Sequence, residues 1–486
     1  MSTHFSFRVG ASGLLTITLA LSACGMPNLG PRPQVRTPAM LDTSRTFATA
    51  EPSAEWPRQE WWRAYGDPQL DALVAEALAG SPSVAAAEAR IRQARGAAEV
   101  VGSQLLPQIG GQGSAGVVKQ SYNNGIPAEF VPKGWKSRGD LALTGDFDLD
   151  LWGRRRNLLE AATSQAEAAM ADASQARLLI ASNVVSSYLD LARLIAREAT
   201  LSEAVASRES LGGLTRRRAE QGIENQTPVR QTEAETARAR IALSANREQI
   251  AARRHALAAL LGAGPDRGLT IRPRPLTQVD EAVLPPDAGI ALAGRRPDIV
   301  AARLRVEAAG SRIDVAKTAF LPDISLRGLL GLTSIGLSNL IDSGSTYGNA
   351  GAALSLPIFD GGRLGGEYRR ARGDFDLAVA DYNATVVDAL REVADALATR
   401  EAAREQAHDA QRAVAAADAA YDLARLRYDA GLYSYIEALS AQQLALASRE
   451  AAIDAQFRIV ASEVALKRAL GGGYAEHMKE KVSTDE

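Results

Sequence analysis

Strict alternation of apolar and polar residues marks four short segments of this chain. In residues 140–151, leucines and a phenylalanine alternate with aspartate, alanine and threonine, so an extended chain would carry one apolar and one acidic face. The same period of two recurs in residues 324–332 and 350–358, and a weaker, glycine-rich example lies near 108–120. Because this period is typical of β-strands, the four segments are predicted to form strands in two widely separated pairs.

The rest of the chain has the pattern of long helices. Residues 133–227 contain no proline, and the stretch from Arg154 to Gln221 would be roughly 100 Å long at about 1.5 Å per residue. Its many Arg, Glu and Gln residues indicate that it lies in water. The Gly212-Gly213 pair is expected to weaken this helix, since each interior glycine costs about 1 kcal/mol. A second helix carries apolar residues at coiled-coil spacing: Phe375, Val379, Tyr382, Val386, Leu390, Val393 and Leu397.

The two halves of the chain repeat one another. The matching pairs are Pro82 and Pro297 and Pro107 and Pro322 at an offset of 215 residues, then Gly153 and Gly362, Gly222 and Gly431, and Leu261 and Leu470 at an offset of 209. A constant register of this kind predicts a tandem duplication, with each half reading as a helix, two strands and a helical hairpin. The predicted parts are a first repeat at 61–262 with strands at about 107–151, a linker at 263–296, a second repeat at 297–473 with strands at about 322–359, and a flexible tail at 474–486.

The N-terminus resembles a targeting segment. Residues 1–23 contain an early positive charge, continue through an apolar stretch too short to cross a bilayer, and end in Leu-Ser-Ala, which is typical of a signal peptide. Cys24 follows as in a bacterial lipobox, where the cysteine is acylated and becomes the first mature residue. The alternative is that Cys24 is a small residue of an ordinary signal peptide. Gly25 in place of Asp favours the outer membrane, and residues 24–60 are predicted to be a lipidated, proline-rich tether.

Composition excludes several classes of protein. The 55 Lys and Arg residues nearly balance the 57 Asp and Glu residues, and a net charge of −2 provides no field for holding nucleic acid. One cysteine and four histidines exclude an internal disulfide and leave little for metal or acid–base chemistry. Residues 111–116 match a dinucleotide fingerprint by letters, but no helix follows them, so we expect no cofactor and no enzymatic activity. The row of Asp146, Asp148 and Asp150 favours a wet lumen over a metal site.

The alternating segments fit either a sandwich or a membrane barrel, and periodicity does not separate the two. Four strands from one chain cannot close a barrel in lipid, where every backbone group needs a partner. Two copies would supply eight strands and three would supply twelve, and only the larger barrel leaves a water-filled bore. Aromatic residues near the predicted strand ends, Phe320, Trp152 and Phe359, are consistent with a belt at the membrane interface.

Four motifs stand out along the mature chain: Trp61-Trp62 with Tyr65-Gly66-Asp67-Pro68, Arg295-Arg296-Pro297-Asp298, Pro357-Ile358-Phe359-Asp360-Gly361-Gly362-Arg363, and Leu470-Gly471-Gly472-Gly473. They resemble the motifs of the outer-membrane factor family, the TolC-like exit ducts. The match is with the lipoprotein branch that serves resistance-nodulation-division efflux pumps, and it covers about residues 56–474. The resemblance implies a mainly α fold with a small membrane β-barrel, built as a homotrimer whose twelve strands continue into an α-helical barrel in the periplasm.

The resemblance also implies a function. Such a protein is the passive outer-membrane exit duct of a tripartite efflux pump for drugs, toxic compounds or metal ions. An inner-membrane pump drives export, and a periplasmic adaptor protein joins the pump to the duct. An exit duct for type I protein secretion is an alternative, and a periplasmic adaptor or scaffold lipoprotein is another. Strands that lie inside each repeat, between helices, favour the duct over the adaptor.

By the same resemblance, the adaptor contacts lie at the tips of the two helical hairpins. Both tips have the pattern Arg-x-x-x-Gly followed by Ile or Leu. Glycine ends a helix without steric penalty and arginine is favourable at a helix C-terminus, so simple capping is an alternative role for these residues. The residues are Arg218, Gly222 and Ile223 in the first tip and Arg427, Gly431 and Leu432 in the second.

The resemblance also places a periplasmic aperture just past the second tip. Its residues are Tyr428, which would latch the two tips together, and Ile436, Glu437 and Ser440. Three copies of Glu437 around an axis would repel one another and attract cations, although an ordinary solvated glutamate is the alternative. Ser440 stands where the family often has aspartate. Pro228, at the position that would pair with Tyr428, cannot be an acidic partner, so a weaker or differently built latch is expected.

Overall fold

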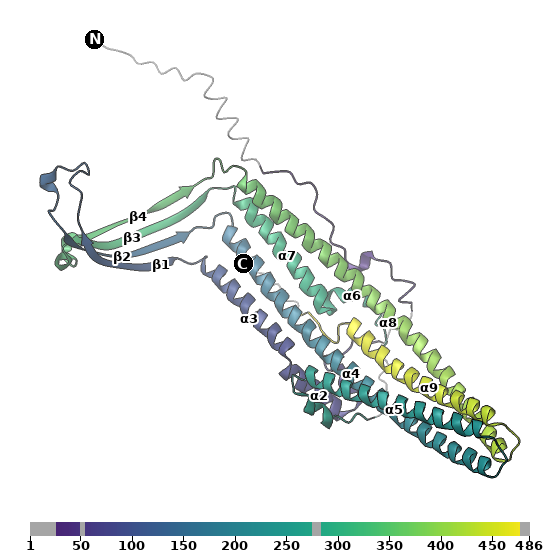
Figure 1. Ribbon diagram of the computed structural model, residues 1–486. Coiled ribbons are helices and arrows are strands. Elements are labelled where there is room, and N and C mark those ends of the chain that lie inside the picture. Colours follow the sequence, from purple (N-terminus) through teal and green to yellow (C-terminus); the bar gives the residue numbers. More distant parts are fainter. Residues whose placement is uncertain (1–25, 49–53, 275–282, 477–486) are drawn as a thin grey trace. The chain divides into compact units, whose positions relative to one another are not determined.

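The computed structural model describes residues 26–48, 54–274 and 283–476 (Figure 1). The predicted signal peptide and the predicted lipidation site Cys24 lie outside these described residues. The chain forms two compact units, each of which combines three segments. Unit one comprises Met1–Gln34, Ile91–Ala168 and Ala302–Asp381, and unit two comprises Val35–Arg90, Ala169–Ala301 and Tyr382–Glu486.

Unit one contains the four predicted strands as one antiparallel sheet in the order β1-β2-β3-β4 (Figure 1). The central strands β2 and β3 come from different repeats, and Leu141 and Leu143 of β2 lie opposite Leu332 and Leu330 of β3. The prediction of four strands is therefore confirmed, and both predicted pairs belong to a single sheet. The strands are β1 Gln108–Val118, β2 Lys136–Asp148, β3 Asp323–Ile335 and β4 Thr346–Ser355.

Two strands end earlier than the alternation predicts. β2 stops at Asp148 because Asp150 has a left-handed backbone with a φ of 43°, which turns the chain out of the extended conformation. β4 stops at Ser355, shortly before Pro357, whose nitrogen has no hydrogen for a further ladder bond. The apolar residues beyond these ends therefore lie in the turns that lead into helices.

The leucine-bearing face of the sheet is uncovered by the described residues. Leu141, Leu143 and Leu330 are 52%, 58% and 61% exposed, and Leu354 on β4 is 69% exposed. β1 and β4 each pair with a neighbour on one side only, so both edges of the sheet carry unpaired backbone groups. A bare apolar face of this kind is typical of a surface that is covered by a partner or by lipid.

The long helices come in pairs of equal length, one from each predicted repeat. α3 and α7 begin at a proline, as predicted, and both end before the proline that precedes the next strand. α4 is free of proline and is one continuous helix, also as predicted. The pairs are α3 Pro82–Ser103 and α7 Pro297–Thr318 with 22 residues each, α4 Arg154–Glu220 and α8 Arg363–Asp429 with 67 each, and α5 Gln226–Leu260 and α9 Tyr435–Ala469 with 35 each.

The glycine pair in α4 does not interrupt the helix. Gly212 instead permits α4 and α5 to approach closely, because a Cβ at this position would lie 2.9 Å from Cγ2 of Thr232 on α5. An 18-residue window of α4 has a mean hydropathy of 1.4, which meets the length and composition of a membrane span, but 61% of that window is buried inside the structure. Such burial is typical of a core helix.

The core of unit two is built around the Trp-Trp motif. The aromatic residues of the short helix η2 Trp61–Tyr65 are buried against leucines of α2 Pro68–Gly80 and against α4. Asp67 caps α2 by accepting a hydrogen bond from the backbone N–H of Gln69 at 2.9 Å, and it also accepts one from buried Tyr188 of α4. The remaining short elements are η1 Pro38–Met40, η3 Ala128–Phe130, η4 Pro265–Thr270, η5 Leu337–Asn339, η6 Ser343–Ser345 and α6 Ala288–Arg295.

Arg296, from the second motif, is a buried anchor within unit two. Its side chain is 6% exposed and pairs with Asp298 at 2.6 Å and with Glu392 at 2.8 Å. It also donates a hydrogen bond to the backbone oxygen of Ala469 at 3.0 Å. These contacts join the start of α7 to α8 and to the end of α9.

The described start of the predicted tether lies against α8. Residues 26–34 have no helix or strand, as expected of a proline-rich segment. Buried Arg372 of α8 donates a hydrogen bond to the backbone oxygen of Gly30 at 3.3 Å, and the guanidinium carbon of Arg32 lies 5.4 Å from the centre of the Phe375 ring. This part of the tether is therefore docked on unit one.

Candidate functional site at the helical tips

Both helical hairpins of unit two turn on a glycine. Gly222 and Gly431 have φ values of 70° and 77°, a conformation that only glycine adopts without penalty. The backbone N–H of Ile223 donates to the oxygen of Arg218 at 2.9 Å, and that of Leu432 donates to the oxygen of Arg427 at 2.8 Å. These bonds close the last turns of α4 and α8, so the capping role considered for the two glycines is present in the structure.

The two arginines of the shared tip pattern have different surroundings. The guanidinium carbon of Arg218 lies 5.0 Å from the centre of the Tyr428 ring, and its Nη1 donates to the backbone oxygen of Tyr428 at 3.0 Å. Arg427 is exposed and instead stacks on Tyr433 of its own tip, to whose hydroxyl it donates at 2.7 Å. Arg218 therefore joins the two tips, whereas Arg427 remains on the surface of the second.

Tyr428 is completely buried at the centre of this junction. Its hydroxyl donates a hydrogen bond to Oε2 of Glu224 at 3.1 Å, and Nε of Arg218 lies 3.5 Å from the other oxygen of Glu224. Burial, and then the charge of Glu224, raise the pKa of Tyr428 well above its usual range, so the hydroxyl remains a donor. The Tyr435 ring packs edge-on at 6.4 Å. Arg218, Glu224 and Tyr428 are called the tip latch below.

The acidic member of the tip latch was missed by the sequence analysis. Pro228 does not pair with Tyr428, and Glu224, earlier in the same turn, takes that place. The available signal was the position of Glu224 two residues after Gly222, in the segment that faces the second tip. The acid that Tyr428 contacts is therefore at position 224, and the latching role of Tyr428 stays a prediction.

Three of the predicted aperture residues, Ile436, Glu437 and Ser440, lie at the start of α9. Glu437 and Ser434 form a capping box: the Glu437 carboxylate accepts from the Ser434 N–H at 2.7 Å, and the Ser434 hydroxyl oxygen accepts from the Glu437 N–H. These hydrogen bonds lower the pKa of Glu437, whose side chain is exposed. Ile436 is 60% exposed, and Ser440, one turn further on, is also exposed.

A polar seam joins α4 of the first repeat to α9 of the second. Three ion pairs cross it at 2.7 to 2.9 Å, followed toward the tips by a cluster of uncharged polar side chains. The two hairpins of unit two are therefore held together along this seam as well as at the tip latch. The ion pairs are Arg193 with Asp454, Arg197 with Glu450 and Arg449 with Glu203, and the cluster consists of Ser207, Tyr421 and Gln442.

The aspartates near the end of β2 form ion pairs with arginines of α4. Asp148 pairs with Arg155 at 2.6 Å and Asp150 with Arg156 at 3.2 Å. Asp150 also accepts hydrogen bonds from the first backbone N–H groups of α4 and so caps that helix. Among the described residues, no group of three or more His, Cys, Asp or Glu side chains is arranged to hold a metal ion.

Comparisons with known proteins agree with the motifs. Residues 73–263 and 291–472 match the family described as outer membrane efflux protein. The fusaric acid resistance protein FusA of Burkholderia cepacia is 36% identical over 362 residues, which are 73% of this chain and 67% of that protein. The multidrug resistance outer membrane protein MdtP of Escherichia coli K12 is 30% identical over 484 residues, which are 96% of this chain and 97% of MdtP.

A solved structure shares the fold. The outer membrane protein VceC of Vibrio cholerae is 37% identical, superimposes with a TM-score of 0.82, and is matched over 86% of this chain and 100% of its own. The predicted mainly helical fold with a small sheet is thereby confirmed, as is the location in the outer membrane. The chain belongs to the outer membrane efflux protein family and is an outer-membrane channel of an efflux system.

Proposed function

We propose that three copies of this chain assemble into one passive exit duct, with a twelve-stranded barrel in the outer membrane and a helical barrel in the periplasm. The observation that carries this proposal is the four-stranded sheet with two open edges and a bare leucine face. In lipid every backbone group needs a partner, so β1 and β4 must pair with neighbouring copies. Three copies give a barrel wide enough for a water-filled bore, whereas two would give one filled by its own side chains.

The duct is the outer-membrane part of a tripartite efflux pump for small toxic molecules. The names of MdtP and FusA, which refer to multidrug and fusaric acid resistance, support this class of cargo. A pump in the inner membrane supplies the energy and a periplasmic adaptor protein connects it to the duct. The duct itself needs no cofactor and performs no enzymatic reaction, in keeping with a family described as efflux proteins.

The two tips receive the adaptor. Ile223 and Leu432 are 59% and 76% exposed at the turns, and exposed Arg427 adds a positive charge beside Leu432. Gly222 and Gly431 set the shape of the turns on which these side chains are displayed. Arg218 serves the tip latch, so we assign it an indirect role: it orients the tips for the adaptor.

The start of α9 lines the periplasmic aperture. Ile436, Glu437 and Ser440 from three copies would surround one axis, with Tyr428 holding the tips in the closed arrangement. The depressed pKa of Glu437 keeps its carboxylate ionised at neutral pH, so three copies would form a ring that attracts cations. Acylation of Cys24 would anchor the duct further, and the docked tether at 26–34 supports a short distance between this anchor and unit one.

The experiment on assembly uses cysteine pairs at the two sheet edges. Ala115→Cys on β1 and Ala350→Cys on β4 are combined in one chain, with neighbouring positions tested as a small panel to cover the register. Because β1 and β4 lie at opposite edges of one sheet, only contacts between copies can form the disulfide. Oxidation is expected to give covalent trimers, and each single variant none. A final product of covalent dimers, or of uncrosslinked monomers throughout the panel, would overturn the proposal.

Adaptor docking is tested separately. Leu432→Asp should abolish drug resistance in a complemented deletion strain while the trimer still forms, because a charge is placed at the exposed apolar contact. Gln221→Asp adds the same charge to an exposed polar site and is expected to retain resistance. Full resistance with Leu432→Asp would exclude this tip from docking.

A further inference from the structure

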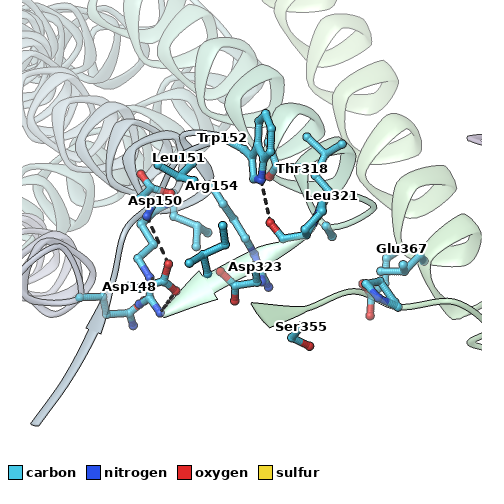
Figure 2. Close-up of a pocket in the computed structure, with 18 of the residues that line it drawn as sticks. Asp148, Asp150, Leu151, Trp152, Arg154, Thr318, Leu321, Asp323, Ser355 and Glu367 are labelled. Carbon is cyan, nitrogen blue, oxygen red and sulfur yellow. Dashed lines mark hydrogen bonds and ion pairs between the residues drawn. The ribbon is translucent and has the colours of Figure 1, made fainter. Parts of the chain in front are cut away.

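The two ends of the sheet in unit one lead to different parts of the chain. One end continues into α4 and α8, and the other carries the connections 119–135 and 336–345 (Figure 1). Near the helices, the indole N–H of Trp152 donates to the backbone oxygen of Pro322 at 2.7 Å, which fixes the ring there (Figure 2). The end with the two connections is called the outer end, because in the proposed duct it faces away from the periplasm.

The leucine-bearing face of the sheet reaches the outer end. Val117 near the end of β1 is 70% exposed, and the register places it on the same face as Leu141 of β2. The β3–β4 connection covers this face at Gly139, where a Cβ would lie 2.8 Å from Cδ1 of Leu337. Leu337 and Ile341 of this connection are themselves 48% and 86% exposed. The apolar surface is therefore continuous up to the last residues of the strands.

The sheet has the height of a membrane-spanning segment. β2 has 13 residues, which extend over about 43 Å at about 3.3 Å per residue. A strand of a membrane barrel is tilted by about 35–45°, so β2 would rise about 30–35 Å across the bilayer. This height exceeds an apolar band of about 25 Å. Exposed Trp135 and Trp152, which flank β2 at its two ends, would therefore lie at the level of the lipid headgroups.

Lysines gather at the outer end. The chain has seven lysines among its 55 basic residues, and three of these lysines, Lys119, Lys133 and Lys136, flank or belong to the β1–β2 connection. All three are exposed, and none makes an ion pair with any described residue. Glu129 and Asp342, the acids of the two connections, do not pair with them either. The lysine charges are therefore available to an anionic ligand.

The register separates two of these lysines onto opposite faces. Lys136 lies opposite Val118 in the last pair of β1 and β2. Because side chains alternate along a strand, this pair belongs to the face opposite the leucines. Lys119 and Trp135, one residue further along each strand, continue the leucine-bearing face by the same alternation.

The β1–β2 connection is closed beside Trp135. The Tyr122 hydroxyl accepts a hydrogen bond from the backbone N–H of Gly134 at 3.0 Å, and Gly134 turns the chain with a φ of 77°. This contact holds Lys133, directly before the turn, at the outer end together with Lys119. These three residues, Lys119, Lys133 and Trp135, are called the outer patch below.

We propose that the outer patch binds lipopolysaccharide in the outer leaflet of the outer membrane. Lys119 and Lys133 contact its phosphates, and Trp135 lies where the sugars meet the acyl chains. Two lysines in each protomer match the two phosphates of lipid A. Phospholipids of the inner leaflet would meet the other end of the sheet, near Trp152, and do not compete for this patch. This inference rests on the proposed function, since it requires the sheet to span the outer membrane.

Binding is measured by native mass spectrometry on the full trimer, delipidated and titrated with lipid A that carries two phosphates, with monophosphorylated lipid A and with phosphatidylglycerol. We expect the parent protein to bind the form with two phosphates most tightly. Lys119→Gln and Lys133→Gln should each weaken this binding about fivefold, the usual effect of one lysine at an anionic lipid surface, and about 25-fold together. In the double variant the preference for the second phosphate should disappear.

Lys136→Gln is the matched control, because it removes the same charge from the same end of the sheet but from the opposite face. This variant should bind lipid A as the parent does. The proposal would be overturned if the parent bound phosphatidylglycerol as tightly as lipid A, if the double variant kept its affinity, or if Lys136→Gln lost as much as Lys119→Gln. Conductance and covalent trimer formation are recorded on the same samples. Weak lipid A binding by an intact conducting trimer rejects the outer patch alone, whereas failure to form trimers rejects the proposed function.

Discussion

Removing Glu224 should weaken the junction between the two helical tips and so favour an open state of the proposed aperture. In the tip latch, Glu224 accepts a hydrogen bond from the buried hydroxyl of Tyr428 at 3.1 Å and lies 3.5 Å from Nε of Arg218. The side chains of Arg218 and Glu224 are only 14% and 16% exposed, so solvent screens this pair weakly. Glu224→Ala therefore leaves a buried hydroxyl without its acceptor and a guanidinium without its carboxylate.

The size of the effect follows from these contacts. A hydrogen bond to a charged acceptor contributes about 1.5–3 kcal/mol, and the partly buried ion pair adds up to about 1 kcal/mol. Arg218 keeps its contact with the ring and backbone oxygen of Tyr428, so part of the junction survives. We expect a loss of about 2–4 kcal/mol per protomer, which corresponds to a shift of about 30- to 700-fold toward separated tips.

Single-channel recording in planar bilayers measures this shift directly. Glu224→Ala is expected to raise the open fraction and to sensitise cells to antibiotics normally too bulky for the outer membrane. Glu220→Ala, at the exposed end of α4 and without an ion pair among the described residues, is the matched control. Tyr428→Phe should act like Glu224→Ala, and the double variant should add little to either. An open fraction equal to that of the parent in both single variants would refute the role of the latch.

Three further predictions concern the scaffold and the start of α9. Arg296→Met should lower the temperature at which the trimer dissociates on heating, because breaking the buried pair of Arg296 with Glu392 costs about 3 kcal/mol. Arg391→Met breaks exposed ion pairs instead and should leave this temperature nearly unchanged. The capping box should stabilise the start of α9 above about pH 4, and this stabilisation should be lost as the pH falls through the depressed pKa of Glu437. Amide hydrogen exchange at the start of α9 should show the loss. In Ser434→Ala this pH dependence should be absent. Gly472→Ala should destabilise the trimer by about 1–2 kcal/mol in the same heating assay, because a Cβ there would lie 2.2 Å from Cδ1 of Leu178 at a φ of 57°; dissociation at the parent temperature would contradict this.

Much of the scaffold could be predicted because its determinants are local. Prolines at the first turn and beyond the last turn bracket α3 and α7, and alternation within each strand gives its two faces. The early end of β2 was missed because the alternation continues into the turn, and only the left-handed backbone of Asp150 stops the strand. The capping box of Ser434 and Glu437 has a sequence signature of its own, a serine followed three residues later by a glutamate, which the prediction of Glu437 as an aperture residue left out.

Contacts between distant segments could not be predicted in the same way. Glu224 and Tyr428 are separated by 204 residues, and the buried Arg372 that docks the tether is more than 340 residues from Gly30. Such pairs depend on how helices pack side by side. The periodicity within one helix does not predict which other helix packs against it. A glutamate in a turn or an arginine on a helix has the same local signature whether it is solvated or buried in a junction.

The predicted duplication is consistent with one tip latch in each protomer instead of two. At the offset of 209 residues, Glu224 corresponds to Tyr433 and Tyr428 corresponds to Ala219, so each repeat carries only one member of the hydrogen-bonded pair. The arginine is kept in both repeats, but Arg218 finds Tyr428 across the junction while Arg427 finds Tyr433 within its own tip. The two repeats thus have helices of equal length, and a few substitutions at the turns give their arginines different contacts. Arg218 lies in the junction between the tips, whereas Arg427 and Leu432 remain exposed on the second tip.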